Sequence, residues 1–205
     1  MARYRGPVGK ISRRLGIGIT DKGQRVLNKR SFPPGQHGPS ARRRQVSDYG
    51  LQLLEKQKLR LNYGLTERQF RRLYKEAVAS RDPSGDKLLE FLERRLDNFV
   101  FRAGFAPTAV AARQLVRHKH VLLNGRAVNI PSIRIRPGDR IQLGERARRI
   151  PVVVEALAEP ALTRPEWLVF DEAAFVATMT RTPSPDEVPF PVDVQQVVEY
   201  YAVRL

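Results

Sequence analysis

Three histidines are the side chains of this sequence best suited to metal binding or proton transfer. His118 and His120 form a His-x-His pair, whereas His37 stands alone between a glutamine and a glycine. Two imidazoles supply only part of a zinc site, and no third and fourth ligands are evident nearby. Around His37 there is no serine and aspartate arrangement of a hydrolytic triad. The sequence therefore predicts no metal site and no catalytic residue, and leaves hydrogen bonding or stacking as the role of the paired histidines.

The segment Gly18–Gln24 has the glycine spacing of a phosphate-binding loop. Such a loop needs Lys-Ser or Lys-Thr directly after its second glycine and a strand before its first, and both are missing. The chain also has no cysteine, which excludes disulfides, thiol nucleophiles and iron–sulfur clusters. We therefore expect neither nucleotide binding here nor any cofactor.

The distribution of charge favours a polyanion as the partner. The 205 residues include 37 Lys and Arg against 21 Asp and Glu, a net charge of +16. Residues 1–50 carry +10 and residues 101–150 carry +9, whereas residues 51–100 carry +3 and residues 151–205 carry −6. Cations that neutralise phosphates release condensed counterions, and the basic helices lack the bulky apolar face of a membrane-surface helix. We interpret the pattern as binding of nucleic acid.

The composition predicts a folded protein. Hydrophobic residues make up 41% of the chain, no apolar run approaches 18 residues, and the first residues carry charge without the apolar stretch of a secretory signal. We expect a cytoplasmic location. Residues 1–46 contain many glycines and prolines with little periodicity, so they predict an extended basic arm that orders only on its partner.

Residues 47–96 predict a helical domain. Ser47 is the expected N-cap of a helix that ends at Gly64, and Thr66–Gln69 forms a capping box flanked by the staple residues Leu65 and Phe70. Beyond a break at residues 82–85, apolar residues recur at helical spacing. The inward positions are expected to be Phe70, Leu73, Ala77, Val78, Leu88, Leu89, Leu92, Leu96 and Phe99, with Arg60, Arg68, Arg71, Arg72, Arg94 and Arg95 on the opposite faces.

Residues 97–191 predict a further helix followed by short strands. Thr108 is the expected N-cap of a helix over 108–118 that packs Ala112, Leu115 and Val116 inward. Strands are expected at 121–123, 127–130, 133–136, 140–143, 167–170 and 175–179, with a hairpin turn at Asn124–Gly125. The alternation in 133–136 places isoleucines on one face and arginines on the other. Residues 152–157 fit strand or helix, 183–191 a linker, and Asp193 starts a last helix that must dock because it is short.

Three stretches carry a resemblance to a known module: Arg95–Asn98, Ala112–His118 and Leu123–Gly125 resemble the S-four RNA-binding module. Further segments in the same order are similar to the family of bacterial small-subunit ribosomal protein four, of which this chain would be a cysteine-free variant. These segments are Met1–Pro7, Ser31–Gly38, Ser47–Tyr49, Glu55–Arg60 and Thr66–Arg71. The similarity covers residues 1 to about 143 and is weak beyond residue 150.

The resemblance implies an α+β fold. A helical domain, completed by the C-terminal helix 192–205, would contain an inserted module of helices and a small five-stranded antiparallel sheet. It also implies a structural protein that is not an enzyme, a primary binder of small-subunit ribosomal RNA at a multi-helix junction that nucleates assembly of the subunit body. Ribosomal protein five and messenger RNA, where it enters the subunit, are the further partners implied, with an effect on translational accuracy.

The candidate RNA-binding residues are mostly cations of the two basic stretches. They are Arg3, Tyr4, Arg5, Arg13, Arg14, Arg30, Gln36, His37, Arg42, Arg43, Arg44, Lys56, Lys58, Arg60, Arg68, Arg71, Arg72, Arg113, Gln114, Arg117, His118, Lys119, His120, Arg134 and Arg136. By position in the family, Arg42, Arg43 and Arg44 are the candidates for the surface where messenger RNA enters.

The chain departs from the family pattern at two places. Many relatives hold zinc or an iron–sulfur cluster with four cysteines in the N-terminal arm, where Gly9, Ser12 and Val26 stand near those positions. The arm must then be held without metal. Where the module often has Gly between two histidines, this chain has Lys119, which we expect in a left-handed conformation that glycine adopts more easily.

Two alternative functions use the same module. Pseudouridine synthases carry it with an Arg-Leu-Asp catalytic signature that Arg95–Asp97 matches superficially, but no large sheet domain is available for such an enzyme, and a salt-bridge role for Asp97 fits better. A heat-shock or stalled-ribosome rescue factor would instead bind large-subunit particles.

Overall fold

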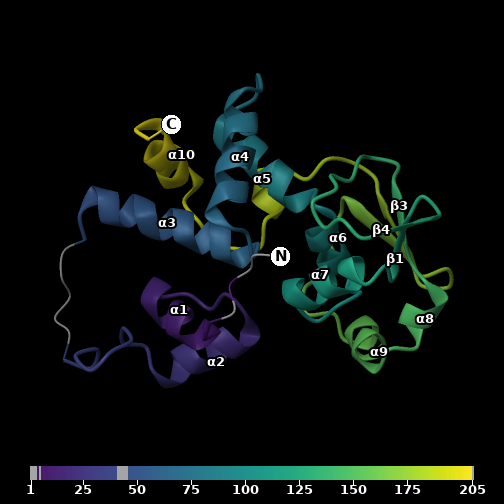
Figure 1. Cartoon of the computed structure of the whole chain (residues 1–205), viewed down its shortest axis with the longest axis horizontal. Helices are drawn as coiled ribbons and strands as arrows, with labels where there is room; N and C mark the ends of the chain where they lie inside the picture. Colours follow the sequence, from purple (N-terminus) through teal and green to yellow (C-terminus); the bar gives the residue numbers. More distant parts are fainter. Residues whose placement is uncertain (1–3, 5, 41–45, 205) are drawn as a thin grey trace. The chain divides into compact units, whose positions relative to one another are not determined.

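The computed structural model describes Tyr4, residues 6–40 and residues 46–204. The chain divides into two compact units, one made of Met1–Gly85 with Phe190–Leu205 and the other of Asp86–Pro189. The second unit is therefore inserted into the first along the sequence (Figure 1). The three-part division expected from the sequence, with boundaries at 46, 96 and 191, stays a prediction.

The first unit begins with a pair of short helices, α1 (Val8–Leu15) and α2 (Asp21–Lys29). The extended arm expected here was wrong for these residues. The sequence analysis interpreted the glycines of this segment as helix breakers, but they let the two helices approach closely. A Cβ on Gly9 would lie 3.0 Å from Val26 Cγ1, and one on Gly23 would lie 2.3 Å from the Oγ of Ser12. Ser12 is fully buried at this contact.

A loop over residues 30–40 is attached to α1 by one arginine. The Arg13 guanidinium donates hydrogen bonds to the carbonyl oxygens of Phe32 and Pro33, both at 2.9 Å, and lies 4.6 Å from the centroid of the Phe32 ring. The charge of Arg13 thus fixes a loop of its own unit.

Two longer helices, α3 (Asp48–Asn62) and α4 (Glu67–Val78), form the body of the first unit. The expected caps are confirmed, because Ser47 accepts from the Gly50 amide and the Thr66–Gln69 capping box is complete in both directions. The expected end at Gly64 is also confirmed, since this glycine takes a φ of 60° directly after Tyr63, the C-cap of the helix. Of the apolar positions expected inside α4, Val78 was wrong: it is 51% exposed in the last turn.

The C-terminal helix α10 (Val194–Ala202) docks on α3 and α4, as its length requires. The Tyr201 hydroxyl donates to Glu67 at 2.6 Å, and the Tyr74 hydroxyl donates to the Val198 carbonyl at 3.1 Å. Burial and the neighbouring Glu67 raise the pKa of Tyr201. Burial acts to raise the pKa of Glu67 too, but hydrogen bonds from Tyr201 and Lys56 outweigh it and hold this pKa below its usual value. The two pairs anchor the end of the chain.

The second unit starts along α5 (Ser84–Glu93), followed by α6 (Leu96–Arg102) and α7 (Ala109–Arg117). Arg95 interrupts the helical periodicity with an extended conformation and forms an isolated antiparallel bridge with Arg134. The strand expected at 133–136 was wrong, because its backbone pairs with this break instead: the Ile135 amide donates to the Arg94 carbonyl and the Leu96 amide to the Ile133 carbonyl, both at 2.8 Å.

A five-stranded antiparallel sheet confirms the expected α+β fold. Its strands are β1 (Val121–Leu123), β2 (Arg126–Val128), β3 (Arg140–Leu143), β4 (Leu168–Asp171) and β5 (Val176–Met179), in the spatial order β2-β1-β3-β5-β4. The expected hairpin turn joins β1 and β2, with positive φ at both Asn124 and Gly125. Its register pairs Val121 with Val128.

Three further helical segments complete this unit: α8 (Glu145–Arg148), α9 (Pro151–Ala158) and the short 3-10 helix η1 (Pro185–Glu187). The segment that fitted strand or helix is therefore the helix α9. The core of the unit is built around Trp167, Phe99 and Phe105, all nearly inaccessible to solvent. Within the part of the chain that the structure describes, no helix is both long and apolar enough to cross a bilayer.

We predict that η1 makes the second unit sensitive to acid. Hydrogen bonds from Arg181 at 2.9 and 2.7 Å, opposed by partial burial and assisted by Ser184, lower the pKa of Glu187 from 4.5 to about 2. Since the folded pKa is depressed, this stabilisation is present above pH 4.5 and is lost as the pH falls toward 2. The Glu187→Gln variant should therefore lose less stability than the wild type between those pH values, as measured by thermal unfolding. Glu159→Gln, an exposed carboxyl change, should behave like the wild type.

Candidate nucleic-acid interface

Several of the predicted contact residues in the first unit are exposed and form no ion pair with the described residues. Arg14 and Arg30 belong to the α1 and α2 region, and Arg68 and Arg71 lie on α4. Tyr4, Gln36 and His37 are exposed as well. These side chains can reach a phosphate or base without breaking an internal bond.

Other predicted residues of this unit are occupied by internal partners. Lys56 is buried and pairs with Glu67 at 2.9 Å, and the same carboxylate lies 3.4 Å from Arg60. Lys58 pairs with Glu55, and Arg72 with Glu76 at 3.1 Å. Together with Arg13 on its loop, Lys56 is therefore assigned a structural role. The predicted residues Arg3, Arg5, Arg42, Arg43 and Arg44 lie outside the described residues.

In the second unit, α7 is the helix that brings the predicted residues together. Thr108 caps it as expected, accepting from the Ala111 amide at 3.1 Å. Gln114, Arg117 and His118 are exposed along its last turns, and Lys119 is exposed directly after it. Arg113 differs: it is 6% exposed and lies 3.5 Å from Asp97, so it faces the interior of its unit.

The turn after α7 has a particular backbone geometry. The Lys119 amide donates to the Val116 carbonyl and the His120 amide donates to the Leu115 carbonyl, both at 3.0 Å, which is the Schellman pattern of a helix end. Lys119 takes a φ of 61° in it, which confirms the expected left-handed conformation. Glycine usually fills this position, so the lysine side chain is kept at the expense of backbone strain.

We predict that Lys119→Gly stabilises the second unit by about 0.8 kcal/mol, within a range of about 0–1.6 kcal/mol. Relief of left-handed strain is worth about 1–2 kcal/mol, from which the larger entropy of glycine in the unfolded chain removes about 0.4–1 kcal/mol. Urea unfolding followed by the fluorescence of Trp167 measures the change. Lys119→Ala is the matched control, because it removes the same charge and keeps the Cβ. The prediction fails if the alanine variant is as stable as the glycine variant.

The loop that replaces the expected strand carries two of the predicted arginines. Arg136 is exposed, while its backbone amide donates to Asp139 at 2.7 Å. Arg134 is half-buried, with its guanidinium 4.0 Å from the centroid of the Phe91 ring. Ile135 is fully buried on the other side. The apolar back and cationic front expected from the alternation are thus present, in a loop rather than in the sheet.

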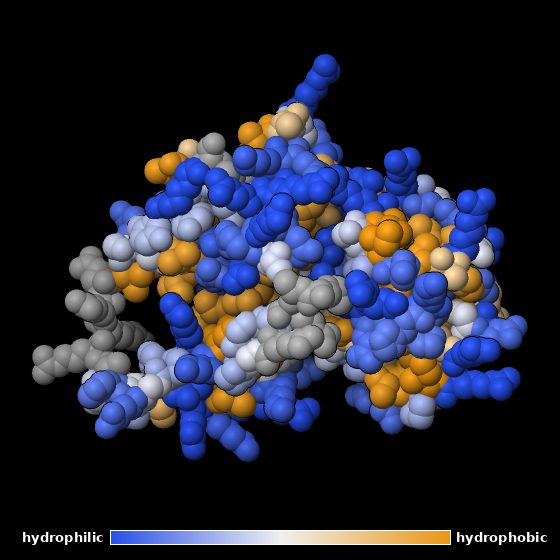
Figure 2. All heavy atoms as spheres, in the orientation of Figure 1, coloured by the Kyte–Doolittle hydropathy of each residue, from blue (hydrophilic) through white to orange (hydrophobic). Residues whose placement is uncertain are grey.

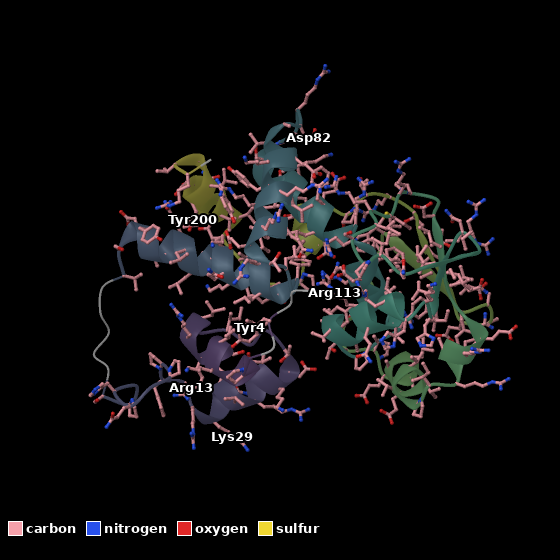
Figure 3. All side chains as sticks on the ribbon, in the orientation of Figure 1. Tyr4, Arg13, Lys29, Asp82, Arg113 and Tyr200 are labelled. Atoms are coloured by element: carbon pink, nitrogen blue, oxygen red, sulfur yellow. The ribbon has the colours of Figure 1, made fainter. Side chains whose placement is uncertain are left out.

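Exposed cations that the sequence analysis did not select lie beside those it did. The α1 and α2 pair carries four of them, Lys10, Lys22, Arg25 and Lys29. Figure 3 shows Lys29 at the outer edge of the pair. Arg126, Arg140, Arg146 and Arg149 lie on the strands and helix after α7. The charge excess of the two basic stretches was the signal that could have found them. Hydrophilic side chains accordingly cover much of the face of each unit drawn in Figure 2.

The carboxylate that could have served in catalysis is enclosed. Asp97 accepts two hydrogen bonds from the Arg95 guanidinium, both at 3.0 Å, and one from the Asn98 amide at 3.1 Å. It is 5% exposed. A carboxylate in this position orients side chains of its own unit.

Gly9, Ser12 and Val26, which the resemblance placed near cysteine positions of the family, hold groups unsuited to a metal. The Val26 side chain packs against the Gly9 backbone, and the Ser12 hydroxyl lies 3.4 Å from the Ile19 amide. These residues offer no thiolate. Across the described ranges, no cluster of three or more His, Cys, Asp or Glu side chains is placed to hold a metal ion.

Comparisons with known proteins give consistent matches along the chain. A family model described as the ribosomal protein S4/S9 N-terminal domain matches residues 3–93, and one described as the S4 domain matches residues 94–141. The small ribosomal subunit protein uS4 of Methylobacillus flagellatus is 56% identical over 205 residues, which is 100% of each chain. Protein uS4B of Nitrosomonas europaea is 53% identical over 205 residues, again 100% of both. Protein uS4 of a Roseiflexus species is 54% identical, over 98% of this chain and 100% of the relative.

Proposed function

Because this chain belongs to the ribosomal protein S4 family, we propose that it is a structural constituent of the small ribosomal subunit and a primary binder of its ribosomal RNA. It joins a multi-helix junction early and nucleates assembly of the subunit body, in the cytoplasm. The observation that carries the proposal is the set of exposed cations on each unit that form no ion pair with the described residues.

Recognition in this proposal depends on phosphates more than on bases. Exposed Arg and Lys side chains neutralise the RNA backbone, and polar groups such as Gln114 and His118 fix the register. Folded RNA presents a deep, narrow major groove that side chains cannot read, so shape supplies most of the specificity. The acidic residues 151–205 would be repelled by phosphate and belong on surfaces turned away from the RNA.

The proposal includes a contribution to translational accuracy where messenger RNA enters the subunit. Arg42, Arg43 and Arg44 are its candidate residues, and their net charge of +3 within three positions suits a polyphosphate chain. Ribosomal protein five is the expected neighbour at that place.

Crosslinking the protein to RNA in cells and sequencing the adducts tests the proposal. We expect the adducts to concentrate in one junction of small-subunit ribosomal RNA. Adducts in large-subunit RNA would favour a rescue factor, and adducts scattered evenly over cellular RNA would contradict a specific ribosomal role.

The protein is proposed to have no catalytic activity of its own. The enclosed Asp97 supports this, since the pseudouridine synthase alternative needs that carboxylate at a substrate. Incubation of the purified chain with uridine-labelled ribosomal RNA is expected to leave the uridine unchanged. Conversion that Asp97→Asn abolishes would overturn the proposal.

A further inference from the structure

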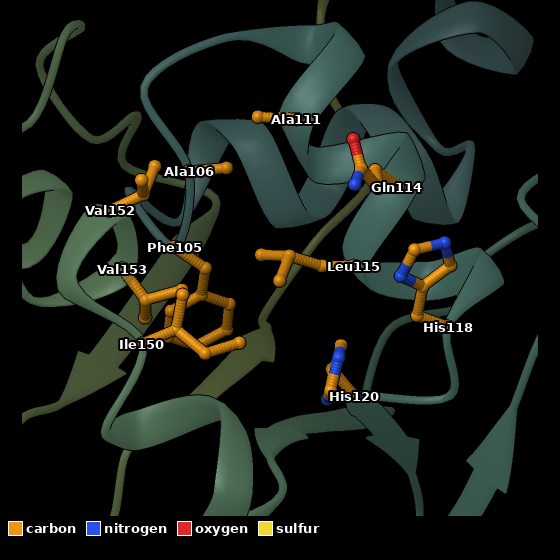
Figure 4. Close-up of a pocket in the computed structure, with 10 residues that line it drawn as sticks. All are labelled: Phe105, Ala106, Ala111, Gln114, Leu115, His118, His120, Ile150, Val152 and Val153. Atoms are coloured by element: carbon orange, nitrogen blue, oxygen red, sulfur yellow. The ribbon is translucent and has the colours of Figure 1, made fainter.

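A cavity of about 200 Å³ lies in the second unit, between α7 with its following turn and the start of α9. Figure 4 shows Leu115 in its middle, the apolar side chains of Phe105, Ile150 and Val153 on one side, and the polar side chains on the other. The polar side chains are Gln114, His118 and His120. The cavity therefore has an apolar wall facing a wall of hydrogen-bonding groups.

The left-handed turn at Lys119 is what brings the two imidazoles together. It reverses the chain between His118 and His120, so both rings line the cavity, with their centroids 6.1 Å apart at an interplanar angle of 57°. The Lys119 side chain stays exposed outside the cavity. The strained backbone at Lys119, where glycine would be relaxed, thus accompanies the placement of both imidazoles at the cavity.

The charges adjacent in sequence to the lining residues match a nucleic acid. Arg117, Lys119 and Arg149 are exposed, are adjacent in sequence to lining residues, and form no ion pair in the described part of the chain. None of the lining residues is acidic. A nucleotide with its base inside the cavity would carry a phosphate on each side of its sugar, and exposed cations on the segments that line the cavity are suited to neutralise phosphates.

We propose that this cavity holds a single unstacked nucleobase of the bound RNA, an inference that rests on the proposed RNA binding. The apolar wall and the imidazoles contact the faces of the base, and the Gln114 amide offers a donor and an acceptor to its edge. Figure 2 shows apolar side chains gathered over the α9 end of this unit, where Val152 is 48% exposed next to the cavity. An aromatic side chain of another protein would fill the same space without using the three cations.

The first test fills the cavity without changing the charge. Ala111 lines the cavity, so the side chain of Ala111→Phe occupies the space of the base. We expect the affinity of the full chain for a junction fragment of small-subunit ribosomal RNA to fall by about 5- to 150-fold, the range of one stacked base, with an unchanged salt dependence. Val110→Phe is the matched control, because this neighbour is 51% exposed and does not line the cavity.

A second test identifies the base and does not depend on the folding of the filled variant. Junction fragments with one abasic nucleotide at each unpaired position are bound to the wild type, to Gln114→Ala and to His118→Ala, two changes at exposed positions. We expect one abasic position to weaken RNA binding by the wild type and to weaken it less for both variants. The reason is that the free-energy effects of removing two groups in contact with each other are not additive.

The outcomes distinguish a failure of the nucleobase proposal from a failure of the proposed function. If the wild type binds the junction but no abasic position couples to the variants, the nucleobase proposal is overturned and the proposed function stands. If Ala111→Phe keeps its RNA affinity and loses a neighbouring ribosomal protein instead, the cavity is a protein site and the proposal is equally overturned. If the wild type does not bind the junction at all, the proposed function itself fails.

Discussion

Raising the salt concentration from 50 to 200 mM is expected to lower the affinity of this protein for its ribosomal RNA junction by about 10³–10⁵. The reason is the number of phosphates neutralised, which we take as roughly 6–10, each of which releases counterions. Exposed cations such as Arg68, Arg71 and Arg117, which have no ion pair among the described residues, supply these contacts. A salt titration with a labelled junction fragment measures the slope.

Single-charge variants sharpen this test. Arg71→Gln and Arg117→Gln should each reduce the logarithmic salt slope by about 1, whatever the RNA sequence. Arg181→Gln is the control, because Arg181 is also exposed but is held by Glu187 at 2.7 Å in the acidic part of the chain. A nearly flat titration of the wild type, or equal binding to heparin and to every RNA offered, would contradict phosphate-based recognition of a specific junction.

Arg102→Met is expected to destabilise the second unit by about 3–5 kcal/mol, the usual cost of leaving one charge of a buried pair without its partner. Arg102 donates two hydrogen bonds to Glu93, at 2.9 and 2.8 Å, and the two side chains are 5% and 2% exposed. Glu93 also accepts a hydrogen bond from Asn98 at 3.0 Å. Urea unfolding followed at Trp167 reports on this unit, since it is the only tryptophan of the chain and is 1% exposed.

The control for this prediction is a pair of the same chemistry at the surface. Arg72→Met breaks the pair with Glu76, but the Arg72 side chain is 83% exposed, so the loss should stay below about 0.5 kcal/mol. Because Arg72 lies in the first unit, the unfolding of this variant is followed by circular dichroism rather than at Trp167. Adding Glu93→Gln to Arg102→Met removes the uncompensated charge and should restore part of the stability. If Arg102→Met and Arg72→Met unfold at the same urea concentration as the wild type, the burial of the Arg102–Glu93 pair does not govern its contribution to stability.

Helix starts and tight turns in this protein were predictable from the sequence because a few neighbouring residues determine them. Ser47, Thr66 and Thr108 each satisfy an amide three residues away, so the chemistry of the cap lies within the same short segment. The Asn124–Gly125 hairpin is local in the same sense, whereas the left-handed Lys119 was expected from the family pattern. The charge excess of each basic stretch, which indicated RNA, is a property of composition alone.

Glycine was ambiguous because its role depends on what approaches it. In residues 8–29 the glycines read as breaks in an extended arm, whereas Gly9 and Gly23 are the points where α1 and α2 touch. No sequence pattern within either helix predicts that the other helix packs against its glycine. Only the tertiary structure decides whether a missing side chain means freedom or contact.

The sequence by itself determined where several helices and tight turns begin, since these depend on neighbouring residues. Its charge predicted an anionic partner, and the resemblance of its motifs to a known family gave the fold class. The tertiary structure decided which cations remain available. Lys56 and Arg113 carry the same charge as Arg68 and Arg117, yet carboxylates brought from elsewhere in the chain neutralise the first two. The reason is physical: burial and ion pairing are set by residues far apart in sequence, so the free charge of a side chain is a property of the folded unit.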